Sequence, residues 1–339
     1  MRQAQRSGDN STNIQGEVVN LGLSYRDARE IAKDVYEENI TKFTDIARNV
    51  ASERAQEFTD KLLSALPMEA LETLKDPDVQ RSLFHAQQEY ACSGEKDLGD
   101  LLIHLLSDKM KGPKGGIKAL ALSEALKTAP KVTSSHISAL SVLMLITQTK
   151  LGVESIEAFQ ESMKQILAPI AEDLHVSNSD LAYLEYAGCL SISAFDNAVG
   201  NMFATTYPGL FTNGFMPENI AEPSRATVMP ITIPCLRDPA NVQLPIMTKG
   251  ELKELAGQSV FQGHAQEITR LIDVGLMSGE QIEQEVSGIH PTLADFAKKY
   301  NGSRLKNCQL TAIGTTLAHT NLKRVLGEHF DTELDIWVN

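Results

Sequence analysis

Residues 24–66 read SYRDAREIAKDVYEENITKFTDIARNVASERAQEFTDKLLSAL, and this stretch decides the class of fold. It contains no proline or glycine, the two residue types that most often interrupt a helix. Ser24 and Asp27 form a capping box at its start, and Pro67 stops it. We therefore predict one continuous helix, which would be roughly 65 Å long at 1.5 Å per residue.

Apolar residues recur along this helix at an average step of about 3.7 residues, closer to an eleven-residue repeat than to heptads. A partner helix packed on this stripe would run nearly straight, so we expect the long helix to bundle with neighbouring subunits. Two i,i+4 pairs, Glu38 with Lys42 and Glu57 with Lys61, support the outer face. The inward positions are Ala28, Ala32, Val35, Asn39, Phe43, Ile46, Val50, Arg54, Phe58, Leu62 and Ala65.

The segment before the helix differs from the rest of the chain, because residues 7–22 are rich in Asn, Ser, Thr and Gln and are divided by glycines. Alternation of side chains along an extended strand would place Ser11, Asn13 and Gln15 on one face. A single polar strand is not stable alone, so it pairs with the rest of the chain, pairs with copies of itself or stays disordered. We assign 1–23 as a polar β oligomerisation segment. Its self-assembly candidates are Asn10, Ser11, Asn13, Ile14 and Gln15.

The remaining chain predicts a mainly α fold of several domains. Residues 24–111 hold the long helix and helical hairpins, and 112–207 form a helical domain. Six prolines between 217 and 245 mark 208–249 as an ordered loop, and 250–339 form a C-terminal helical domain that ends in an apolar strand, Leu334–Val338. Helices that end at glycine before an apolar exit, at 184–190 and 271–277, suggest a small winged-helix-like α+β region near the C-terminus.

Composition limits the class of protein and its compartment. The 31 basic and 44 acidic residues give a formal net charge of −13, which disfavours nucleic-acid binding. The four cysteines form no C-x-x-C unit, so we expect free thiols in a reducing cytoplasm. The N-terminus lacks the apolar region of a signal peptide, and the longest apolar stretch, Ile137–Ile146, is too short to cross a membrane.

No established catalytic or metal-binding motif is present. The sequence has no H-E-x-x-H, no G-x-S-x-G and no G-x-x-x-x-G-K-[ST], so we expect no metal and no cofactor. Thr311 can cap a helix whose buried stripe is Ile313, Leu317 and Leu322. His319 and Asn321 would then lie at the surface or a boundary of that helix. They are the weak catalytic candidates: His319 would act in acid–base chemistry or contact a partner, and the favoured alternative is that it packs or caps locally.

Seven internal motifs and the C-terminal D-I-W-V resemble those of an uncharacterised bacterial protein family over the whole chain length. The resemblance implies no particular reaction. The N-terminal motif is also similar to short polar β motifs of bacterial conflict and antiphage-defence proteins, some of which self-assemble. The motifs are GDNSTNIQ (8–15), DPDVQ (76–80), LGDLL (98–102), LEYAGC (184–189), YPGLFTNGF (207–215), IPCLRDP (233–239) and LTAIGTTLAHTNLKR (310–324).

Three functions fit these observations. The first is a self-assembling cytosolic scaffold or sensor, which the N-terminal motif links to antiphage defence. It would form homo-oligomers through 1–23 and the long helix and contact a protein partner. The second is a hydrolase or nuclease whose dispersed site lies near His319, Asn321 and the 207–240 loop, and it requires a carboxylate within hydrogen-bond reach of His319. The third is a winged-helix nucleic-acid binder.

Overall fold

The computed structural model describes residues 25–67, 70 and 72–338, with side chains from Thr44 onward in these ranges. The predicted mainly α class is confirmed, and the sheets in the described ranges are small two-stranded ones. Contacts divide the chain into two compact units, Met1–Arg54 and Ala55–Asn339. The proposed β segment 1–23, with its self-assembly candidates, lies outside the described residues.

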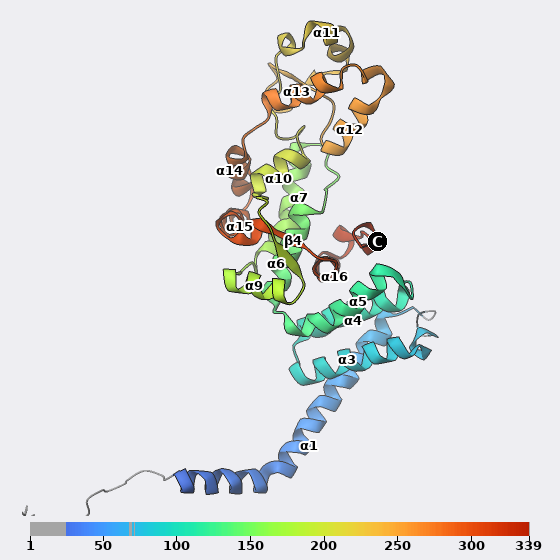
Figure 1. The fold of residues 1–339 in the computed structure, drawn as a ribbon, viewed down its shortest axis with the longest axis vertical. Helices are drawn as coiled ribbons and strands as arrows, with labels where there is room; N and C mark the ends of the chain where they lie inside the picture. Colours follow the sequence, from blue (N-terminus) through green and yellow to red (C-terminus); the bar gives the residue numbers. More distant parts are fainter. Residues whose placement is uncertain (1–24, 68–69, 71, 339) are drawn as a thin grey trace, which may run out of the picture. The chain divides into compact units, whose positions relative to one another are not determined.

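The long helix α1 spans Tyr25–Ala65, as predicted, and ends before Pro67 (Figure 1). In the first unit, the side chains at 44–50 are all exposed, and those of Ile46 and Val50 are 63% and 39% exposed. In the second unit, Phe58 and Leu62 are buried in the core. The stripe there continues to Leu66 and not to the predicted Ala65, which is exposed.

Three antiparallel helices follow α1 and form one end of the second unit. A 3-10 turn at Glu72–Lys75 precedes α3 (Pro77–Ser93), which Asp76 caps by accepting a hydrogen bond from the Asp78 amide at 2.9 Å. Helices α4 (Lys96–Lys111) and α5 (Gly116–Thr128) pack beside it, and residues 112–115 separate them. The leucines of α4 enter the core: Leu101, Leu102, Leu105 and Leu106.

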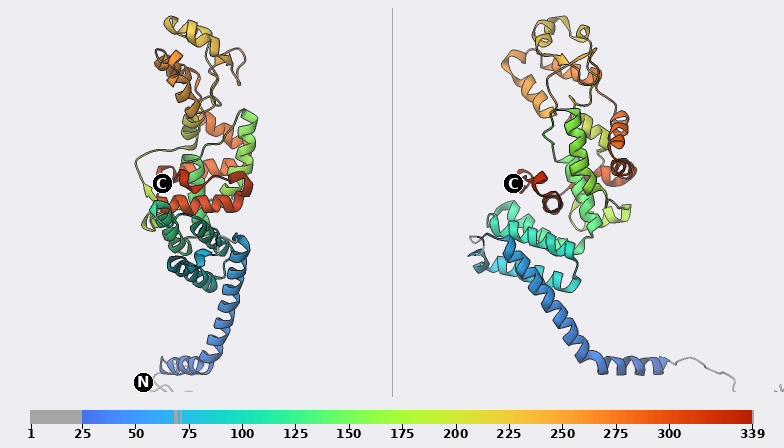
Figure 2. Two further views of the ribbon diagram at one scale, coloured as in Figure 1. Left: turned by 90° about the vertical axis from the view of Figure 1, so that its right-hand side faces the viewer. Right: turned by 180° about the vertical axis from the view of Figure 1, so that it is seen from behind.

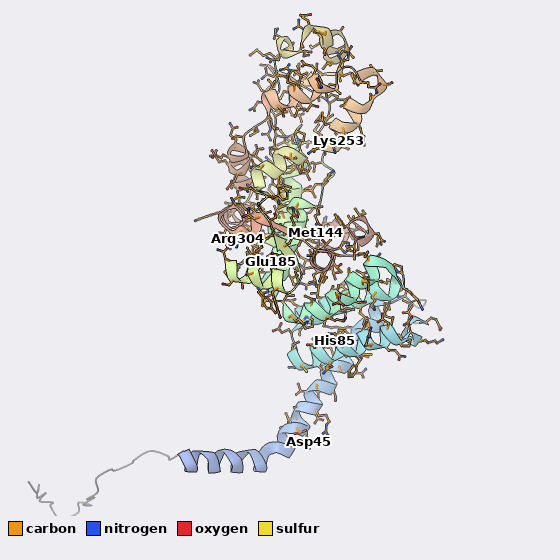
Figure 3. All side chains as sticks on the ribbon, viewed as in Figure 1. Asp45, His85, Met144, Glu185, Lys253 and Arg304 are labelled. Atoms are coloured by element: carbon orange, nitrogen blue, oxygen red, sulfur yellow. The ribbon has the colours of Figure 1, made fainter. Side chains whose placement is uncertain are left out.

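The centre of the second unit is the pair α6 (Ser134–Thr147) and α16 (Ala312–Leu326). Every residue of α6 from Ile137 to Ile146 is buried, which explains the apolar run in the sequence. Met144, one of these buried residues, is labelled in Figure 3. Around this pair lie α7 (Ile156–Ser162), α8 (Ala168–Ala171), α10 (Val199–Thr206), α14 (Gly279–Ile289) and α15 (Pro291–Gly302). A π-helical turn, Met163–Leu167, precedes Pro169 and joins α7 to α8.

Two distant segments form the small sheet in this body. Helix α9 (Asn178–Tyr186) ends before Gly188 and leads into β1 (Leu190–Ile192). A 3-10 turn, Arg304–Asn307, leads into β4 (Cys308–Leu310), which pairs with β1 in antiparallel register, Leu190 opposite Leu310. A wing is a hairpin of consecutive strands, whereas these strands are far apart in sequence. The described residues of the C-terminal region therefore contribute helices and one strand, β4, to this sheet. They do not form the hairpin wing that we expected there.

Residues 213–275 form a small lobe with its own apolar core, centred on Phe215, Val228 and Leu271. Its elements lie together at one end of the second unit in Figures 1 and 2. They include much of the predicted proline-rich loop, in which Leu244 is buried and Leu236 is 41% exposed. The elements are Pro217–Asn219 (3-10), α11 (Glu222–Val228), Met229–Ile231 (3-10), β2 (Ile233–Pro234), β3 (Val242–Gln243), α12 (Lys249–Gly257), Ser259–Phe261 (3-10) and α13 (Ala265–Gly275).

The two chain segments that enter and leave the lobe are joined at its base. The Asn213 amide donates to the Gly275 carbonyl at 2.8 Å, and a Cβ added at Gly275 would lie 2.0 Å from the Gly214 carbonyl oxygen. Arg237 binds both carboxylate oxygens of Glu285 on α14, at 2.8 and 2.9 Å. The same guanidinium donates to the Leu210 carbonyl and lies 5.3 Å from the centre of the Phe211 ring. Two of the family-like motifs, 207–215 and 233–239, therefore meet at this junction.

The predicted C-terminal strand at Leu334–Val338 is wrong. Gly327–Phe330 and Leu334–Ile336 are 3-10 turns, and the Val338 amide donates to the Leu334 carbonyl at 3.1 Å. Leu334 and Val338, four residues apart, are each 2% exposed, so one side of a turn is buried and the alternating pattern of a strand is not used. The indole Nε1 of Trp337 donates to the Gln148 carbonyl at 3.0 Å and fixes the turn to the body.

Candidate functional site

Helix α16 carries the two residues that the sequence suggested, and it is buried on more than one face. It begins at Thr311, whose hydroxyl accepts a hydrogen bond from the Gly314 amide at 3.2 Å. It packs against α6, α5 and α4, and the C-terminal 3-10 turn Gly327–Phe330 also contacts it. The prediction that His319 and Asn321 lie at the surface or a boundary is therefore wrong: they are 1% and 6% exposed.

His319 faces the C-terminal turns and is sealed in the core. Its Nε2 lies 2.6 Å from the Thr332 carbonyl oxygen, so this nitrogen carries the proton and donates. The ring centres of Phe330 and Trp337 each lie 5.6 Å from the centre of the imidazole. Nδ1 of His319 has no hydrogen-bond partner in the described chain. No carboxylate binds this ring among the described residues, so the condition that we set for acid–base chemistry at His319 is not met.

Burial of His319 predicts acid sensitivity of the fold. Desolvation lowers the pKa of His319, because a charged imidazolium would lose water, while the Thr332 carbonyl partly opposes this shift. The unfolded chain, with an ordinary histidine pKa of about 6.5, then binds the proton more readily than the folded chain. The neutral His319 therefore contributes fully to the free energy of unfolding above the pKa of the unfolded chain. This contribution is lost as the pH falls through the lowered pKa of His319 in the folded chain.

We expect the free energy of unfolding, measured in urea from pH 7.5 to 5, to fall less in His319→Gln than in the parent protein. Glutamine keeps an N–H donor for the Thr332 carbonyl but has no proton to bind in this range. His329→Gln is the matched control, because His329 is exposed on the neighbouring turn Gly327–Phe330. Equal slopes for His319→Gln and the parent would contradict the assignment.

Asn321 faces the other side of α16 and belongs to a chain of polar contacts. Its amide Nδ2 donates to the Ser141 hydroxyl on α6 at 3.0 Å, and its Oδ1 accepts from Nη2 of Arg324 at 2.9 Å. Nη1 of Arg324 donates to the Asp97 carboxylate on α4 at 3.2 Å. The chain therefore runs from the buried Ser141 to the exposed Asp97 and connects three helices.

A cleft of about 520 Å³ opens where this chain reaches the surface. The start of α4, the first turns of α6 with the segment before them, α8 with Asp173 after it, and the last turns of α16 surround it. Its polar side chains include Asn321 and Arg324, and its apolar side chains include Leu98, Leu101 and Ile137. The full lining is Glu95, Lys96, Asp97, Leu98, Leu101, Ala129, Val132, Ser134, Ile137, Ser138, Pro169, Ile170, Asp173, Asn321, Arg324 and Val325.

Arg324 is the residue of this cleft that can bind a ligand most directly. Its side chain is 23% exposed, and its two terminal nitrogens are held by Asp97 and Asn321. A guanidinium has five N–H donors, so donors remain beyond these two contacts. The sequence analysis identified Asn321 and missed Arg324 and Asp97. The spacing of Asn321 and Arg324, three residues apart at the end of the 310–324 motif, was the signal that would place them on one face.

Two other polar pairs were candidates for chemistry. The imidazole of His136 uses both nitrogens: Nδ1 accepts from the Thr133 amide at 3.2 Å and Nε2 lies 3.3 Å from Asp180. This pair joins the capped starts of α6 and α9 and is structural. In the small lobe, the Ser224 hydroxyl lies 2.9 Å from Nδ1 of His264, and no carboxylate of the described chain orients that ring.

The described residues contain no group of three or more His, Cys, Asp or Glu side chains arranged to bind a metal ion. Within the same part of the chain, no helix combines the length and hydrophobicity that a membrane crossing needs.

Fold and site together define a mainly α protein with a helical body, a small lobe and a polar cleft beside α16. A family model matches residues 22–338, and the chain belongs to that family, which is uncharacterised. The match begins after the N-terminal GDNSTNIQ motif. Neither the curated proteins nor the solved structures contain a match to the chain.

Proposed function

We propose that the protein is a self-assembling cytosolic scaffold or sensor whose subunits associate through α1, together with the segment 1–23. A role in antiphage defence fits the N-terminal motif. The observation that carries the proposal is that α1 continues as a helix through 44–50, where every side chain is exposed. Most helical stability in proteins comes from packing of an apolar face, so a helix exposed all round calls for a partner.

The exposed stretch offers an apolar face for that partner. Ile46 and Val50 lie about 40° apart around the helix axis, because successive residues are about 100° apart. Their exposed fractions, 63% and 39%, leave apolar area that a second helix can cover. Complete burial of such a side chain is worth about 1.5–3 kcal/mol. Asp45 and Arg48 form an ion pair at 3.4 Å, and both side chains are mostly exposed, as expected for the solvated flank of the interface.

A second copy of this chain is the partner that we propose, because the stripe predicted from the sequence repeats along the whole helix. Identical helices present identical stripes, and a near-straight pair would cover the stripe up to Val50, because Phe58 and Leu62 are already buried in the core of their own subunit. The polar β segment directly precedes the helix, so strand pairing between copies would add to the same interface.

The molar mass of the full-length protein, measured by light scattering after size exclusion, tests this proposal. We expect an oligomer for the parent, and a monomer for Ile46→Glu combined with Val50→Glu, because two carboxylates in an apolar helix pair cost several kcal/mol. Ser52→Glu adds one carboxylate, half the charge of the double variant, on the side of the helix away from Val50 and should keep the oligomer. Circular dichroism confirms that each variant is helical.

Two results would contradict the proposal: a monomeric parent, or a double variant with the mass of the parent. Deleting residues 1–22 separates the contribution of the N-terminal segment. An unchanged mass after that deletion would remove the segment from the interface and leave α1 as the proposed contact.

A further inference from the structure

The cleft beside α16 has features of a small-molecule site that assembly through α1 does not require. We propose that it binds a small organic molecule with one carboxylate on an apolar body, and that this carboxylate takes the place of Asp97 on Arg324. The volume of about 520 Å³ lies in the range of pockets that hold small ligands, about 300–1,000 Å³.

Arg324 is held in place from inside the protein. Asn321, only 6% exposed, accepts from the Arg324 guanidinium at 2.9 Å, and its own amide is fixed by the fully buried Ser141 at 3.0 Å. A guanidinium positioned in this way loses little freedom when a ligand binds, which favours affinity. Its planar donors match the geometry of a carboxylate.

Asp97 is the group that a ligand would displace. Its side chain is 73% exposed, and it accepts one hydrogen bond from Arg324, at 3.2 Å. An ion pair with such an exposed partner contributes little to stability, so exchanging it for a ligand carboxylate costs little. Asp97 returns to water on exchange, where its charge is well solvated.

The charges around the cleft select a monoanion. Besides Arg324 and Asp97, the lining carries Glu95, Lys96 and Asp173. Once Asp97 moves away, two carboxylates, Glu95 and Asp173, remain beside the two cations. A ligand with a single negative charge is then tolerated, whereas a phosphate with almost two negative charges is disfavoured. The body of the ligand contacts apolar side chains: Leu98, Leu101, Val132, Ile137, Pro169, Ile170 and Val325.

Binding of benzoate to the full-length protein at pH 7, measured by isothermal titration calorimetry, tests this proposal. Benzamide, benzylamine and phenyl phosphate are the neutral, cationic and phosphate comparators. We expect benzoate to bind about ten times more tightly than each comparator, which corresponds to one charge-assisted contact. Binding of benzylamine or phenyl phosphate as tightly as benzoate would overturn the carboxylate assignment.

Two variants test the residues. Arg324→Gln should remove the preference for benzoate over benzamide, and Arg304→Gln, an exposed arginine outside the cleft, should keep it. Asp97→Asn removes the internal competitor and should tighten benzoate binding by about three-fold or more. This gain of affinity cannot result from misfolding, so it decides the question even where Arg324→Gln lowers stability. Unchanged or weaker binding in Asp97→Asn, or no saturable binding of benzoate to the parent, would overturn the proposal.

Discussion

Gly314→Ala is expected to lower the free energy of unfolding by about 3 kcal/mol or more, a large effect for the addition of one methyl group. A Cβ at this position would lie 1.8 Å from the Cys189 carbonyl oxygen. That carbonyl cannot move away easily, because it accepts from the Thr311 amide at 3.1 Å while the Thr311 hydroxyl donates to the adjacent Gly188 carbonyl at 2.6 Å. The methyl group would therefore separate α16 from the start of β1.

Gly288→Ala is the matched control, since Gly288 lies in helix α14 and an added Cβ meets no atom within 4 Å. Alanine should stabilise that helix by about 0.5–1 kcal/mol. Urea unfolding followed by circular dichroism, at one protein concentration, compares both variants with the parent. Equal midpoints for Gly314→Ala and the parent would show that α16 and β1 are not packed as described.

Local signals in the sequence mark the boundaries of these helices. Asp76 followed by Pro77 marks the start of α3, and Gly94, with a left-handed φ of 68°, marks its end. The absence of proline and glycine between 24 and 66 predicted α1. Each of these signals depends on residues within one or two helical turns, so no knowledge of the tertiary fold is needed.

The burial of the candidate site depended on contacts between distant residues and could not be predicted. His319 is covered by Phe330 and Trp337 from the C-terminal tail, whose apolar residues fitted a strand as well as a turn. Arg324 meets Asp97 from another part of the chain. A helix pattern shows which residues share a face but not how many faces are covered, so the polar residues of α16 were placed at the surface.

Arg237→Ala is expected to lower the free energy of unfolding of the small lobe by about 3 kcal/mol. The Arg237 and Glu285 side chains are 16% and 23% exposed, so removal of the arginine leaves a largely buried carboxylate without its partner. The contacts of Arg237 with the Leu210 carbonyl and the Phe211 ring are lost together with the ion pair. Arg81→Ala is the control, because Arg81 is 76% exposed in its pair with Asp78 and should change stability by less than about 0.5 kcal/mol.

Hydrogen exchange can locate the effect of Arg237→Ala, because the lobe has a core of its own and can open while the body stays folded. Amides of α11, α12 and α13 should exchange faster in Arg237→Ala, while those of α6 and α16 keep the protection of the parent. Glu285→Ala should produce the same pattern from the other side of the junction. The double variant should then be more stable than the sum of the two losses predicts, by about 1–2 kcal/mol. Additive losses, or faster exchange throughout the body, would show that the Arg237–Glu285 pair does not act as the clamp between lobe and body.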